Sequence, residues 1–168
     1  MPVFGLNNGM VPIIAYNYGA GHKDRVIKTI KHSVAYGVGI MFVGLLAMHI
    51  FPAQLMRMFD AEESLIAIGA PALETISLSF VFAGFCIVAG SVFQALGNGV
   101  YSMIVSVARQ MCVLLPVAKL LSLSGEVTLI WWAFPIAELA SVLLTSYFLV
   151  RIYRKVICHI GEPVVQDA

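Results

Sequence analysis

The sequence predicts an all-α membrane protein with about four full transmembrane helices and one partial helix at the N-terminus. Hydrophobic residues make up 60% of the 168 residues and charged residues only 11%, and the mean hydropathy is +0.92. A soluble domain is about 45–50% apolar and about 25% charged. A water-soluble chain of this length cannot bury so much apolar surface, so its solvent must be lipid.

The first helix is expected to end at residues 11–21, VPIIAYNYGAG, which resemble the close of a membrane helix. The residues before this stretch hold Asn7 and Asn8 instead of the basic region and apolar run of a secretion signal. We therefore expect a partial span that starts inside the membrane. Such a start indicates a fragment or a truncated reading frame.

The next two apolar runs are residues 33–51, which Pro52 ends, and residues 65–96. A bilayer core of about 30 Å needs roughly 20 helical residues. The second run is too long for one upright span, so we expect its first turns to tilt or to lie at the interface before the core section from Thr75. The turn at residues 97–99 ends it.

The last two spans are expected at residues 101–121 and 127–150, on either side of the break at 124–125. Tryptophans near the start of the last span and tyrosines near its end are typical of the aromatic belts at two membrane surfaces. These residues are Trp131, Trp132, Tyr147 and Tyr153.

Basic residues predict the orientation. Seven of the ten Lys and Arg lie in residues 21–32 or directly after the last span, on the same side if four spans separate them. The positive-inside rule then places residues 21–32 and the C-terminal tail in the cytoplasm. We expect a multi-pass protein of the cell (inner) membrane.

Glu138 is the strongest candidate for a functional residue because it falls near the middle of the span 127–150. An ionisable group at this depth is costly and marks a functional hypothesis. Aromatic and hydroxyl residues share its helical face at intervals of three and four, and they are Trp131, Phe134, Ser141 and Thr145. This face is suited to holding an organic cation or a proton, by charge and by cation–π attraction. The alternative is that Glu138 is a structural anchor between helices.

Two further charged residues are candidates. Arg109 lies about 12 Å into the span 101–121 by helical rise, so a partner is expected for it, although the sequence does not identify Glu138 as that partner. Glu74 follows Pro71 by three residues, near the outer boundary of its span. It is either a proton- or cation-handling group or simply hydrated.

Several other functions are not indicated. The net charge of +1 gives no electrostatic case for nucleic acid. The three cysteines and the histidines do not have metal-ligand spacing, and we expect no metal or cofactor. No nucleophile elbow, phosphate loop or pair of catalytic acids indicates an enzyme.

Four stretches in order resemble the C-terminal half of MATE (multidrug and toxic compound extrusion) transporters. PIIAYNYGAGHKDRVIK is similar to the end of the second helix of that half, and FQALGNG to the end of its fourth helix. RQMCVLLPVAKLL is similar to its fifth helix, and WWAFPIAELAS to its sixth. Residues 1–157 thus resemble part of the C-terminal lobe, and residues 158–168 resemble a cytoplasmic tail.

The resemblance implies a two-lobe transporter of six plus six helices around a central cavity. It implies a secondary active antiporter that exports organic cations or drugs in exchange for Na⁺ or H⁺, with the coupling ion in place of a cofactor. It also implies alternating access about a midplane site, with the bilayer, organic cations and a missing N-terminal lobe as partners. Glu138 and Arg109 match positions where the family pattern also has Glu and Arg.

Two departures limit the resemblance. Val11 stands where a Gln is expected, and the acidic residues that the family uses on its other helices are absent from this chain. An alternative is therefore a truncated, non-transporting membrane remnant of such a transporter. A dimeric small transporter is the third hypothesis, and exposure of Asn7 and Asn8 to lipid argues against it.

Overall fold

The computed structural model describes residues 2–60 and 62–161, and every regular element in these ranges is helical. The helices on the N-terminal side are α1 (Pro2–Gly19), α2 (Lys23–Ile50), α3 (Pro52–Arg57), α4 (Glu63–Ser77) and α5 (Phe80–Ala95). The remaining elements are α6 (Gly99–Val107), a π-helical segment η1 (Ala108–Leu114), α7 (Leu115–Ser122), α8 (Val127–Ile130), α9 (Ala133–Lys155) and a short 3₁₀ turn η2 (Ile157–His159).

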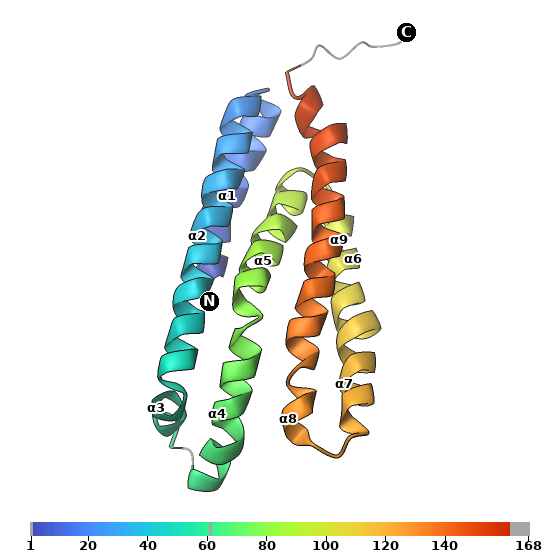
Figure 1. Cartoon of the computed structure of the whole chain (residues 1–168). Helices are drawn as coiled ribbons and strands as arrows, with labels where there is room; N and C mark the ends of the chain where they lie inside the picture. The colour runs from blue at the N-terminus through green and yellow to red at the C-terminus, as the bar shows by residue number, and fades with distance from the viewer. Residues whose placement is uncertain (1, 61, 162–168) are drawn as a thin grey trace.

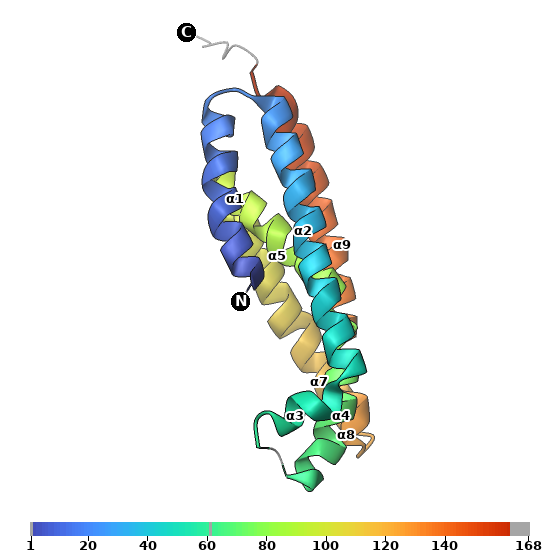
Figure 2. The same ribbon diagram turned by 90° about the vertical axis from the view of Figure 1, so that its left-hand side faces the viewer.

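The long helices lie side by side in one elongated bundle (Figure 1). The turn between α1 and α2 and the C-terminal end of α9 lie at the same end, while α3 and α8 lie at the other (Figures 1 and 2). Lys23 joins the two chain segments at the first end, because its Nζ donates a hydrogen bond to the Cys158 carbonyl at 2.8 Å. The two basic segments are therefore on one side of the bundle, as their spacing along the sequence predicted.

Three helical stretches are long and apolar enough to cross a membrane: Lys23–Ile50, Gly99–Ser122 and Val127–His159. The pair α4 and α5 makes a fourth span if it is counted as one, with a bend of 53° at its break. Helix α1 runs beside only the upper part of α2 (Figures 1 and 2). The prediction of an all-α membrane fold with about four spans and a partial first helix is confirmed.

Helix α2 starts earlier than expected. The apolar run predicted a span from residue 33, with residues 21–32 as a loop, but the helix begins at Lys23. Hydropathy detects only the part of a helix that is inside the hydrocarbon core, and helical structure can continue into the aqueous interface. The basic residues of this segment therefore lie on a rigid helix.

The break between α4 and α5 explains how so long an apolar stretch fits the bundle. Two buried hydroxyls donate to preceding carbonyls there: Ser77 Oγ donates to the Glu74 carbonyl at 2.9 Å, and Ser79 Oγ donates to the Ile76 carbonyl at 2.6 Å. Serine bonds of this kind to preceding carbonyls often accompany a bend. The expected tilt of the first half is thus a sharp bend.

The third span is not a uniform α-helix. The π-helical segment Ala108–Leu114 ends two residues before Pro116. Proline has no N–H to donate, and its ring crowds the carbonyl of the residue four positions earlier, so the preceding turn widens. This irregular turn carries Arg109.

Helices α2 and α5 approach each other most closely at a pair of glycines. A Cβ placed on Gly84 would lie 3.0 Å from the Gly37 carbonyl oxygen and 2.9 Å from Met41 Cγ. A Cβ on Gly37 would lie 2.6 Å from Val88 Cγ2. Small residues at such a crossing let two membrane helices pack backbone to backbone.

We expect Gly84→Ala to destabilise the fold, because its new methyl group meets a backbone oxygen that cannot move without shifting a helix. Overpacking of this kind costs about 1–3 kcal/mol. The matched control is Gly39→Ala on α2, where an added Cβ has no atom within 4 Å. Thermal unfolding of the purified protein in detergent should show a lower Tm for Gly84→Ala and no loss for Gly39→Ala. Equal effects would contradict the close approach.

Candidate functional site

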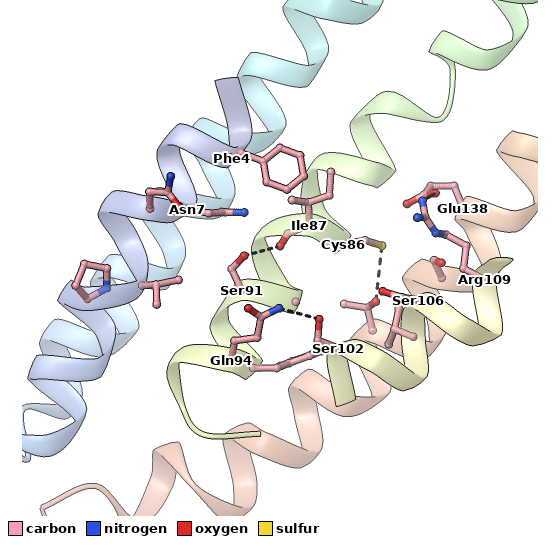
Figure 3. Close-up of a pocket in the computed structure, with 18 residues that line it drawn as sticks. Phe4, Asn7, Cys86, Ile87, Ser91, Gln94, Ser102, Ser106, Arg109 and Glu138 are labelled. Carbon is pink, nitrogen blue, oxygen red and sulfur yellow. Dashed lines mark hydrogen bonds and ion pairs between the residues drawn. The ribbon is translucent and has the colours of Figure 1, made fainter. Parts of the chain in front are cut away.

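A cavity of about 530 Å³ lies between α1, α5, the third span and α9 (Figure 3). Most of the side chains that line it are polar, which is unusual within a bundle of apolar helices. The polar lining residues are Asn7, Asn8, Cys86, Ser91, Gln94, Ser102, Ser106, Arg109, Glu138, Ser141 and Thr145.

An ion pair forms one wall of the cavity. Arg109 Nη1 donates to Glu138 Oε2 at 3.1 Å, so the π-helical segment supplies the cation and α9 supplies the anion (Figure 3). The Glu138 side chain is only 6% exposed, whereas the Arg109 side chain is 42% exposed. The partner that Arg109 was expected to need is therefore Glu138.

One carboxylate oxygen of Glu138 has no hydrogen-bond partner in the described part of the chain. Its Oε1 is buried and has no hydrogen-bond partner among the described residues, and the same holds for Ser141 Oγ one turn later. Thr145 Oγ1 donates to Cys86 Sγ at 3.7 Å across the helix pair. Glu138, Ser141 and Thr145 are buried on one face of α9, as their spacing predicted, and all three line the cavity.

The aromatic part of the predicted face is wrong. Trp131 precedes α9 in the turn after α8, and neither it nor Phe134 lines the cavity. Helical spacing places Trp131 on the face of Glu138 only if the helix is unbroken from residue 127, but the helix is interrupted at Trp131–Trp132. Phe134 is exposed on the outside of α9. These two rings are therefore not placed to add cation–π attraction for a cation held at Glu138.

Glu74 is also outside the site. It is exposed on α4, and the cavity does not include it. This placement agrees with the alternative hypothesis, in which Glu74 is simply hydrated at the boundary of its span.

The amide and hydroxyl side of the cavity was not predicted from the sequence, and the expected exposure of Asn7 to lipid is wrong. Asn7 on α1 is 6% exposed, and its Oδ1 has no partner within the described chain. Gln94 Nε2 donates to Ser102 Oγ at 3.2 Å and so links α5 to α6 (Figure 3). The signal was available, because Ser102, Ser106 and Arg109 repeat at intervals of four and three and so share one helical face.

One aromatic ring reaches the cavity from another helix. Phe4 on α1 is among the lining residues and is exposed. Phe93 on α5 also borders the cavity, but its ring is fully buried and packs edge-on against Tyr101.

Two buried oxygens on residues that line the cavity, Glu138 Oε1 and Asn7 Oδ1, have no hydrogen-bond donor among the described residues. The cavity can donate hydrogen bonds from the guanidinium of Arg109, which is half-exposed. Across residues 2–60 and 62–161, no group of three His, Cys, Asp or Glu side chains is placed to hold a metal ion. The site is suited to a ligand with polar and aromatic parts.

The family model MatE matches residues 1–120 of the chain. Among curated proteins, the chain is 24% identical to the multidrug export protein MepA of Staphylococcus haemolyticus over 91% of its own length and 33% of that protein. It is 26% identical to MepA of Staphylococcus aureus over 81% of its length and 30% of that protein. The chain thus spans about a third of the length of these relatives.

Solved structures give the same result. The chain superimposes on the MATE multidrug transporter DinF-BH with a TM-score of 0.83 and 32% identity over 91% of the chain and 34% of DinF-BH. An inward-facing multidrug resistance MATE transporter of the MOP superfamily gives a TM-score of 0.79 at 15% identity, which supports the fold alone. The family-model match over most of the chain and this structural agreement establish what the four sequence motifs suggested: the chain belongs to the MATE family.

Proposed function

We propose that this chain forms part of the C-terminal lobe of a secondary active antiporter that exports organic cations or drugs in exchange for Na⁺ or H⁺. The observation that carries the proposal is the buried carboxylate of Glu138, held by Arg109 at the wall of a polar cavity in the spans. The opposing lobe of the complete protein would cover the open side of this cavity.

The electrostatics of the pair favour reversible binding of a cation. A lone carboxylate at this depth is expensive, and the Arg109 contact offsets that cost through only one of its two oxygens. The unpartnered Oε1 is buried, and it would accept an N–H donor of a ligand, Na⁺ or a proton that reached it. Ser141 Oγ, buried one turn away and equally unpartnered, adds a second oxygen that suits a small cation.

The size and lining of the cavity fit a small organic molecule. Sites for drug-sized ligands measure about 300–1,000 Å³ and combine apolar walls with a few polar groups. The cavity of about 530 Å³ falls in this range and includes the Phe4 ring beside its polar side chains. Similarity to MepA and to DinF-BH, which are named for multidrug export and transport, supports the same substrate class here.

The basic end of the bundle supports a cytoplasmic location for residues 21–32 and the tail in a cell membrane. Lys and Arg gather at this end on α2 and α9, and cytoplasmic ends of membrane helices carry such an excess. Residues 1–157 would be lobe and residues 158–168 tail.

We expect Glu138→Gln to reduce export by the complete protein at least about tenfold, because an amide cannot bind and release a proton and carries no negative charge. The matched control is Glu74→Gln, which removes an exposed carboxylate outside the cavity and should leave export unchanged. Efflux of a fluorescent organic cation from cells or vesicles measures both, alongside the amount of folded protein.

The two variants separate a transport role from a structural one. Normal folding with lost export for Glu138→Gln supports the proposal. Normal export by Glu138→Gln would overturn it, and loss of folded protein would indicate that Glu138 is an anchor. A loss of export in Glu74→Gln would move the cation site to α4.

The two partners of the ion pair should differ in their effect on stability. We expect Arg109→Gln to destabilise the protein more than Glu138→Gln. Arg109→Gln leaves a nearly buried carboxylate without a cation, whereas Glu138→Gln leaves an unpaired guanidinium that is half-exposed and can be hydrated. In the double variant the two effects should not add, with a coupling free energy on the order of 1 kcal/mol. Thermal unfolding of the four proteins in detergent checks this, and additive effects would show that the pair contributes nothing.

A further inference from the structure

A second cavity, of about 340 Å³, lies on the outer face of α9 near the basic end of the bundle. Its lining residues are Tyr147, Val150, Arg151, Arg154 and Lys155. None of them lines the Glu138 cavity, so the two sites are separate. Three cations within five residues thus surround one surface groove.

These cations have no anionic partner in the described part of the chain. The ion pairs found there are Arg57–Glu63 and Arg109–Glu138, and neither involves the groove. Among the described acidic residues, Asp24 alone belongs to the segments at this end. The groove therefore presents unneutralised positive charge.

An apolar stripe leads along α9 to the cations. Exposed residues at intervals of three and four form it, and they are Ile136, Leu139, Leu143, Tyr147 and Val150. From Ile136 to Arg154 the helix rises by about 27 Å, which is close to the thickness of a hydrocarbon core. The groove thus sits where the apolar surface of the helix gives way to its charged end.

The opposite side of α9 is fixed in the bundle. Ile152 is fully buried, and the Phe148 ring stacks on Tyr101 of α6 with ring centroids 4.6 Å apart. These contacts hold the end of α9 in place, so the backbone positions that carry the three cations are fixed.

We propose that this groove binds the phosphate headgroup of an anionic phospholipid, with an acyl chain along the stripe from Val150 towards Leu143. Guanidinium and ammonium groups form charge-assisted hydrogen bonds with phosphate oxygens, and arginine does so in a bidentate way. The Tyr147 ring lies between the apolar and charged parts, at the level where aromatic residues meet lipid headgroups. Basic pockets at this membrane level are typical lipid headgroup sites.

A lipid fits the groove better than a free phosphate ion. The cations are exposed on one helix, and a hydrated inorganic anion would gain little from them in water. A phospholipid is already held in the membrane beside the stripe, so it adds apolar contact to the ionic contact.

The test compares two double variants with the same loss of charge at the same end of the bundle. Arg151→Gln/Arg154→Gln removes the groove cations, and Lys28→Gln/Lys31→Gln removes two exposed cations from α2, outside the groove. We expect the α9 variant to bind phosphatidylglycerol about tenfold or more weakly and the α2 variant to bind it almost as the unmodified protein does. Native mass spectrometry of the complete protein, titrated with the lipid in detergent, measures both.

Two outcomes of this comparison would overturn the proposal: an equal loss of binding in both variants, which indicates general electrostatic attraction, and unchanged binding in the α9 variant. A second measurement uses the unmodified protein, so it does not depend on the folding of a variant. Phosphatidylglycerol should bind more tightly than phosphatidylcholine and resist competition by millimolar inorganic phosphate. Equal binding of the two lipids, or displacement by inorganic phosphate, would contradict an anionic lipid site.

Discussion

The ion pair between Arg109 and Glu138 is the interaction on which the rest of the site depends. A charge inside an apolar bundle is tolerated only beside its partner, so the π-helical segment and α9 must be neighbours with their charged side chains facing each other. The contact satisfies only one carboxylate oxygen of Glu138, and the other has no hydrogen-bond partner among the described residues. One contact therefore joins two spans and forms a charged wall of the cavity.

Three irregular segments interrupt the described helices, and one of them carries a member of the ion pair. Arg109 lies in the wide π-helical turn before Pro116, and this turn positions the guanidinium that meets Glu138. At the break Ser77–Ser79, two serine hydroxyls donate to preceding carbonyls. The turn at Trp131–Trp132 precedes α9, which carries Glu138.

These irregularities also mark the limit of sequence-based prediction. Hydropathy found the spans, and the cost of a buried charge identified Glu138 and the need of Arg109 for a partner. Spacing placed Ser141 and Thr145 correctly because α9 is continuous from Ala133 onwards. It failed for Trp131 because a turn interrupts the helix there, and for Phe134 because α9 buries another face. Asn7 was expected to face lipid, but it is buried against other helices, and no local pattern reveals such burial.

The charge of the cavity gives the proposed exchange a physical basis. A proton on Glu138 would leave the cavity with the single positive charge of Arg109, and so would one monovalent cation bound to the intact pair. Both together would leave two positive charges in a poorly solvated space, which like-charge repulsion and desolvation disfavour. Arg109 is half-exposed, so the cavity can carry its one positive charge. The described lining residues include no second carboxylate to balance another positive charge. Binding of one cation would thus weaken binding of the other, as antiport through a shared site requires.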